Sequence, residues 1–205
     1  MRAFVSLRAG DLFAFGKGAP APDPDDPLSR LSIEGLEASL KGVGGKLRFV
    51  KADSRHLTLK FLGDLEPADA RAVSQALEGA SKGFPVFPVG PLGVGFFPNA
   101  MRPKVIWVGL DDPKGQLGPL HEAVEKALVP LGRGEPGVAF VPHVTIARVV
   151  EAPPGPALAQ AADPLVRTRF GWAQADGLDF WESTLKKGGP VYRKISEHAF
   201  RGQAP

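Results

Sequence analysis

The sequence contains no cysteine, which excludes disulfides, thiolate nucleophiles and cysteine-ligated metals. It also has no apolar run near the ~20 residues that a membrane-spanning helix needs. The N-terminal stretch carries Arg2, Arg8 and Asp11 where a signal peptide would have an unbroken apolar segment. We therefore expect a cytoplasmic protein without membrane contact. Histidine is scarce as well, and the four that are present are the first candidates for chemistry.

The remaining composition is that of a globular protein. Its 205 residues are 43% hydrophobic, which is enough for a full core, and we expect a single domain over residues 1–205. The 25 basic and 22 acidic side chains give a net charge of +3. This surplus favours an anionic ligand only weakly, because most surface charge is simply solvated.

The order of apolar and turn-forming residues predicts alternating strands and helices. Helices are expected at residues 29–40, 67–77, 116–128 and 157–162, after a Gly-, Pro- and Asp-rich loop at 16–27. Strands are expected at 2–7, 47–53, 56–63, 104–110, 140–150, 168–183 and 191–200, with an edge strand and a loop within 84–98. Many strands are too closely spaced for parallel crossovers, so the pattern predicts an α+β protein with mostly antiparallel sheets.

One short motif occurs twice, as HLTL at residues 56–59 and as HVTI at residues 143–146. Because side chains alternate along a strand, His56, Thr58 and Lys60 should share one face. The apolar side chains of Leu57, Leu59 and Phe61 should then anchor the opposite face in the core.

The same rule places His143, Thr145 and Ala147 on one face of the second strand, with Val144 and Ile146 on the other. If the two strands meet across a cleft, the cleft holds two imidazoles and two hydroxyls. Neither motif supplies a carboxylate or a thiol.

This set of groups suits phosphoryl chemistry. A neutral imidazole can take a proton from attacking water, and a protonated one can donate to the departing oxygen, both near neutral pH. The hydroxyls of Thr58 and Thr145 can donate to non-bridging phosphate oxygens. Metal binding fits poorly, because neither motif has the spacing of a metal site, and we expect no metal or other cofactor.

Through these motifs the chain resembles the 2H phosphoesterase superfamily, in particular its bacterial and archaeal RNA 2′,3′-cyclic phosphodiesterase branch, historically called 2′-5′ RNA ligase. The similarity extends over RAFVSL, HLTLKFLG, VPHVTIAR and FWESTLKKGGPVY. The resemblance implies a bilobal α+β fold of two pseudo-symmetric, intertwined halves, each with an antiparallel sheet and flanking helices, around a central cleft. It also implies that a 2′,3′-cyclic phosphate is opened to a 2′-phosphate, with His56 as proton donor and His143 as proton acceptor.

The resemblance further implies an arginine shortly after the second motif, where Arg148 stands as a candidate phosphate ligand. Strict alternation would direct Arg148 away from His143, so it can reach the phosphate only if the strand ends or bulges first. Lys60 has the correct parity for substrate binding, although an exposed strand lysine is more often only solvated.

Other features have more ordinary interpretations. His121 and His198 lack a threonine partner and are expected to be buried structural residues. A set of aromatic residues could stack a terminal base, but core packing is the more common use. These residues are Phe96, Phe97, Trp107, Trp172 and Trp181.

Three functions remain open on the sequence. The first is metal-independent hydrolysis of RNA 2′,3′-cyclic phosphate ends or of small cyclic nucleotides. The second is reversible 2′-5′ ligation of tRNA halves, and the third is a non-catalytic module that binds RNA ends. A site made within one chain needs no second copy, and we expect a monomer.

Overall fold

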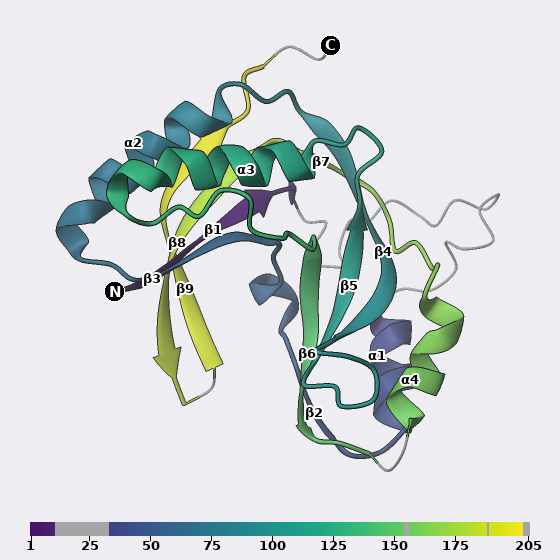
Figure 1. The fold of residues 1–205 in the computed structure, drawn as a ribbon. Coiled ribbons are helices and arrows are strands. Elements are labelled where there is room, and N and C mark those ends of the chain that lie inside the picture. Colours follow the sequence, from purple (N-terminus) through teal and green to yellow (C-terminus); the bar gives the residue numbers. More distant parts are fainter. Residues whose placement is uncertain (11–32, 154–155, 188, 203–205) are drawn as a thin grey trace.

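The computed structural model describes residues 1–10, 33–153, 156–187 and 189–202, and Figure 1 shows its arrangement. The strands are β1 (Arg2–Arg8), β2 (Lys46–Phe49), β3 (Thr58–Asp64), β4 (Phe87–Phe97), β5 (Val105–Asp111), β6 (His143–Glu151), β7 (Ala173–Ala175), β8 (Gly177–Lys186) and β9 (Gly189–Ala199). The α-helices are α1 (Ile33–Gly42), α2 (Ala70–Ser81), α3 (Leu117–Leu128) and α4 (Ala157–Ala162). Among the described residues, no helix is long and apolar enough to cross a membrane.

The strands form two sheets, and the strand pairs in both are antiparallel. The first sheet has the order β3-β1-β8-β9 and the second has the order β2-β6-β5-β4-β7. Counted from the strand that carries the threonine of each motif, the orders β3-β1-β8-β9 and β6-β5-β4-β7 correspond, and β2 is an addition on the outer edge of β6. The α+β class and the two pseudo-symmetric halves are therefore confirmed.

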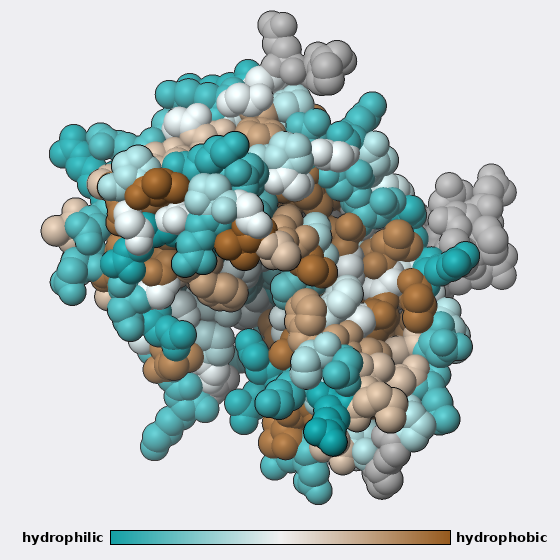
Figure 2. All heavy atoms as spheres, viewed as in Figure 1, coloured by the Kyte–Doolittle hydropathy of each residue, from teal (hydrophilic) through white to brown (hydrophobic). Residues whose placement is uncertain are grey.

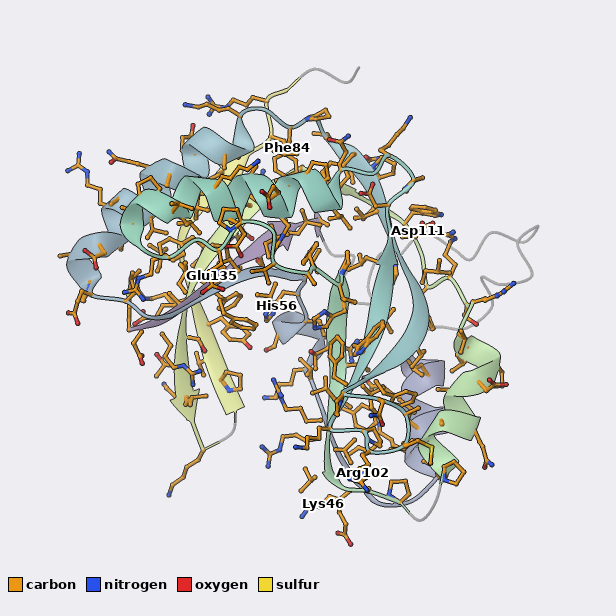
Figure 3. The ribbon with its side chains drawn as sticks, in the orientation of Figure 1. Lys46, His56, Phe84, Arg102, Asp111 and Glu135 are labelled. Carbon is orange, nitrogen blue, oxygen red and sulfur yellow. The ribbon has the colours of Figure 1, made fainter. Side chains whose placement is uncertain are left out.

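The two sheets join where the two motif strands begin. An isolated antiparallel bridge connects Leu57 and Val144, and both side chains are fully buried. Beyond this bridge the sheets diverge, and His56 lies between them (Figure 3). The position of the motifs at this junction follows from the apolar residue inside each motif, which is buried and thereby turns the neighbouring histidine outward.

Helices cover each sheet on the side away from the cleft. Helices α2 and α3 pack together over the first sheet, and α1 and α4 pack together beside the second (Figure 1). Apolar residues at helical spacing explain the packing of α3, in which Leu117, Leu120, Val124 and Leu128 are all buried. Each such leucine contributes roughly 1.5–3 kcal/mol by leaving water.

Most predicted elements are confirmed, with shifted ends. Helix α3 and helix α4 match their predicted ranges, whereas α2 follows a 3₁₀ turn at Pro67–Asp69 and extends to Ser81. A 3₁₀ turn at Ala52–Ser54 separates β2 from β3, so both strands are shorter than predicted. The predicted loop at 16–27 and the first residues of the predicted helix at 29–40 lie outside the described residues.

The prediction of an edge strand within residues 84–98 is wrong. Strand β4 pairs with β5 on one side and with β7 on the other. Past β7 the outer side of β4 is still covered, because Gly93 donates to the Thr168 carbonyl and Phe170 donates to the Pro91 carbonyl. The prolines suggested an exposed edge, but a proline carbonyl still accepts a hydrogen bond within a sheet.

Candidate active site

The two motif histidines are held by the same hydrogen bond. Nδ1 of His56 lies 2.9 Å from the Ser54 carbonyl, and Nδ1 of His143 lies 2.7 Å from the Val141 carbonyl. A carbonyl only accepts, so Nδ1 carries a proton in both rings. Each Nε2 is then left to exchange a proton with a ligand. The orientation of each ring is set by the backbone carbonyl of the residue two positions before it.

The surroundings of His56 are aromatic. Its ring stacks on Phe4 with centroids 4.6 Å apart, and Tyr192 meets it edge-on at 5.3 Å. Burial lowers the pKa of His56, the hydrogen bond to Ser54 opposes this shift, and the nearby charge of His143 adds to it. The electrostatic influence of His143 on His56 also indicates that the two imidazoles lie near each other.

His143 is half-buried and has a looser aromatic environment. Phe97 meets its ring edge-on with centroids 4.9 Å apart, and Trp107 lies at 6.0 Å. The two histidines are thus held by the same kind of hydrogen bond but differ in the aromatic side chains that pack on them.

A β-bulge follows the threonine in each motif. In β3, Ser6 pairs with Thr58 and Val5 pairs with Lys60, so Leu59 is an extra residue. In β6, Trp107 pairs with Thr145 and Ile106 pairs with Ala147, so Ile146 is an extra residue. Each bulge reverses the alternation of side chains beyond it.

The bulge in β6 brings Arg148 to the cleft face. Ile146 and Ala147 are both buried, and Arg148 is the next exposed side chain after Thr145. Burial raises the pKa of Tyr192, and the charge of Arg148 opposes that rise, so this guanidinium lies near the phenol that contacts His56. The prediction that placed Ala147 on the cleft face is wrong for the same reason.

The bulge in β3 turns Lys60 off the His56 face, where it was predicted, although Lys60 still lines the cavity beside His143. Lys60 pairs across the sheet with the buried Val5, and its Nζ lies 2.9 Å from Oε2 of Glu125 on α3. Glu125 also accepts a 2.6 Å hydrogen bond from the backbone N–H of Glu135. Lys60 therefore connects β3 to the segment that leads into His143.

The predicted core position of Phe61 is also wrong. Its side chain is 72% exposed, and it pairs across the sheet with Phe4 on the cleft face. Phe61 occupies the position in the first half that Arg148 occupies in the second.

The threonine hydroxyls lie on the cleft face, as predicted. Thr58 and Thr145 are both half-buried, and no described residue makes a hydrogen bond with either hydroxyl. Both hydroxyls are therefore available to a ligand.

Two cavities flank the histidines, and the surface is hollowed between the β8–β9 hairpin and the lobe that carries β2 and β6 (Figure 2). The cavity beside His56 has a volume of about 300 Å³, and its lining includes Phe4, Trp181 and Tyr192. The cavity beside His143 has a volume of about 380 Å³, and its lining includes Thr58 and Phe97. The cleft can therefore accommodate groups on both sides of a phosphate.

Of the aromatic residues considered for base stacking, Phe97, Trp107 and Trp181 lie at the cleft. Trp172 instead packs under the guanidinium of Arg169, and Phe96 packs against the core. Phe4 and Tyr192 also lie at the cleft, and neither is among the predicted site residues. Phe4 reaches His56 because β1 pairs with β3, the strand of the first motif. The sequence alone does not reveal this pairing.

The other two histidines are buried and have partners. Nδ1 of His198 lies 3.2 Å from Glu78, and its Nε2 lies 3.0 Å from the Ser196 hydroxyl. His121 stacks on Phe140 with centroids 4.3 Å apart. Among the described residues, no group of three or more His, Asp or Glu side chains could hold a metal ion.

Comparison with known proteins agrees with this architecture. Residues 24–184 match the model of the 2′-5′ RNA ligase superfamily. An RNA 2′,3′-cyclic phosphodiesterase of Aeropyrum pernix is 30% identical over 162 residues, which cover 79% of this chain and 91% of the relative. One of Aquifex aeolicus is 30% identical over 171 residues, covering 81% of this chain and 87% of the relative.

Solved structures show the same fold. TT0787 of Thermus thermophilus superposes with a TM-score of 0.72 and 21% identity over 100% of both chains. E. coli LigT complexed with 3′-AMP superposes with a TM-score of 0.65 and 21% identity over 97% of both chains. By its sequence and its fold, the chain belongs to the 2′-5′ RNA ligase superfamily.

Proposed function

We propose that this protein hydrolyses the 2′,3′-cyclic phosphate at the end of an RNA strand to a 2′-phosphomonoester. The observation that carries the proposal is the pair of imidazoles, each anchored through Nδ1 and each with Nε2 left to face one cleft. The names of the Aeropyrum and Aquifex relatives support the same reaction.

In the proposed reaction His143 is the base and His56 is the acid. Nε2 of His143 takes a proton from water while the water oxygen bonds to phosphorus. The bond from phosphorus to the 3′ oxygen breaks, and Nε2 of protonated His56 gives that oxygen a proton. The products are a 3′-hydroxyl and a 2′-phosphate, and proton exchange with water restores both rings.

The environment of His56 fits a donor. Burial under Phe4 disfavours the charged imidazolium, which lowers the pKa and makes the protonated ring a stronger acid. A bound phosphate anion beside the ring favours its protonated form, so substrate binding prepares the donor.

Three further groups can stabilise charge on the phosphate. The hydroxyls of Thr58 and Thr145 donate to non-bridging oxygens, and the Arg148 guanidinium supplies a positive charge and a forked donor. These groups come from the protein itself, and we infer that the reaction needs no metal ion. All of them belong to one chain, so a monomer is sufficient.

The test is incubation of an oligonucleotide ending in a 2′,3′-cyclic phosphate with the protein in the presence of EDTA. We expect a 2′-phosphate product, and at least a ~10²-fold loss of rate in His56→Ala and in His143→Ala. The control is His198→Asn, which should lower the unfolding temperature while keeping the rate. A near wild-type rate in either motif variant would contradict the two-histidine mechanism.

The same experiment separates the alternatives. In ligation the 5′-hydroxyl of a second strand takes the place of water. Its oxygen bonds to phosphorus, the bond from phosphorus to the 3′ oxygen breaks, and the products are a 2′-5′ phosphodiester and a free 3′-hydroxyl. Product that forms only when a 5′-hydroxyl strand is present would favour the ligase, and binding without any product would favour a non-catalytic module.

A further inference from the structure

Two arginines lie directly opposite each other on the wall of the cleft. Strand β2 pairs with β6 so that Arg48 is the partner of Arg148, and both side chains are exposed. Partners in an antiparallel pair share a face, so Arg48 also points into the cleft. The neighbours of Arg48 agree, because Leu47 and Phe49 pack against the core from the opposite face of β2.

This arrangement is unfavourable without a ligand. Like charges directly opposite each other destabilise a strand pair. Within residues 1–10, 33–153, 156–187 and 189–202, no carboxylate pairs with Arg48 or Arg148. An anion between the two guanidinium groups would remove the repulsion.

The opposite wall of the cleft shows the usual arrangement. On β9, Lys194 lies 3.1 Å from Asp179 and over the ring of Trp181, which lines the cavity beside His56. Lys194 on this wall is thus neutralised by a carboxylate of the protein, whereas Arg48 and Arg148 are left for a ligand. Figure 3 shows Lys46, at the start of β2, and Arg102 at the outer end of this lobe.

We propose that Arg48, together with Arg148, binds a second phosphate of the substrate, the phosphodiester on the 5′ side of the terminal nucleotide. The inference rests on the proposed function and specifies its substrate class. A cyclic phosphate ends the strand, so any other phosphate must come from the 5′ side. Arg48 lies on the outer strand of the sheet, one strand spacing of ~4.8 Å from Arg148.

The site therefore selects RNA ends over free cyclic nucleotides. A mononucleoside 2′,3′-cyclic phosphate has no second phosphate and cannot use Arg48. Guanidinium groups bind phosphate through two parallel hydrogen bonds, and lysine does not reproduce this geometry.

The test compares kcat/KM for a nucleoside 2′,3′-cyclic phosphate and for a dinucleotide ending in the same group. We expect the wild type to prefer the dinucleotide by about tenfold, the effect of one charge-assisted contact at an exposed site. Arg48→Gln should lose this preference, and Arg48→Lys should recover only part of it. The dinucleotide should also show a salt dependence whose log–log slope falls by about 1 in Arg48→Gln.

The matched control is Arg193→Gln, which removes an exposed arginine from the face of β9 opposite to the one that carries Tyr192, and it should keep the preference. Unfolding temperatures of Arg48→Gln should equal or exceed that of the wild type, because a like-charge pair is relieved. A wild type that cleaves both substrates equally well would overturn the inference and leave the proposed function standing. If neither substrate is cleaved, the proposed function fails. The role of Arg48 is tested separately by binding of a dinucleotide 2′-phosphate, and equal affinities of the wild type and Arg48→Gln would overturn it.

Discussion

The two motif strands have the same backbone plan but different surroundings. In both, a histidine is anchored to its own chain, a threonine follows, and a bulge comes next. Strand β3 is an edge strand, and its bulge exposes Phe61 on the cleft face. Strand β6 is flanked by β2, and its bulge exposes Arg148 opposite Arg48.

The difference shows how one repeated motif can supply two roles. The motif sets the position of each ring, and the neighbouring strands set its environment. His56 lies under Phe4 and Tyr192, where burial disfavours its charge, and His143 lies on the side that carries the arginines. The rings of Phe4 and Tyr192 pack closely on His56, whereas His143 has looser aromatic contacts with Phe97 and Trp107 and shares its strand with Arg148.

The largest effect on stability is expected where the two halves are tied together, at Lys60. Its ion pair with Glu125 is largely buried, with side-chain exposures of 15% and 2%. Lys60→Met should leave the buried Glu125 carboxylate with only the Glu135 N–H and the His121 ring beside it, and should lower the free energy of unfolding by roughly 3 kcal/mol. Urea unfolding measures this change.

The control for this variant is Lys82→Met, which breaks an exposed pair with Glu78 on one helix. It should change the free energy of unfolding by less than about 0.5 kcal/mol. Equal effects of the two substitutions would show that Lys60 does not hold the halves together.

The next largest effect is a loss of activity, and it is expected to differ between Arg148 and Phe61, the exposed residues that follow the two bulges. Arg148→Ala should lower kcat/KM for the cyclic phosphate by about 10- to 100-fold, because a charged donor to the phosphate is lost. Phe61→Ala removes the equivalent exposed residue of the first half and should change kcat/KM by less than about threefold. If steady-state kinetics gave both variants the same loss of kcat/KM, the role assigned to Arg148 in binding the phosphate would be contradicted.

The smallest effect concerns the pH dependence of stability. Burial lowers the folded-state pKa of His56 below its ordinary value of ~6.5, so the unfolded chain binds more protons between these two values. The free energy of unfolding should therefore fall as the pH drops below ~6.5. His56→Gln should flatten this decline in urea titrations between pH 7 and 5, and an unchanged decline would assign the effect to other groups such as His121, whose pKa burial also lowers.

Much of this architecture could be predicted because it depends on local patterns. Leucines at helical spacing predicted α3, and the repeat of His-x-Thr predicted the two histidines and their threonines. The bulges could not be predicted, since an extra residue is defined only by the strand paired beside it, β1 in one case and β5 in the other.

The consequences of the bulges were equally hidden. Alternation alone predicted that Lys60 shares a face with His56. Its ion-pair partner Glu125 could not be predicted, because it is 65 positions away in the sequence and meets Lys60 only in the folded chain. The opposition of Arg48 and Arg148 likewise depends on the register of β2 against β6. The two halves therefore differ mainly through contacts between residues that are far apart in the sequence.

The most direct test of the acid and base roles uses a substrate in which sulfur replaces the 3′ oxygen of the cyclic phosphate. A thiolate departs without a proton, because a thiol has a pKa near ~8.5. His56→Ala should then cleave this substrate at close to the wild-type rate, while His143→Ala should remain at least ~10²-fold slower. Rescue of His143→Ala in place of His56→Ala would contradict the assigned roles.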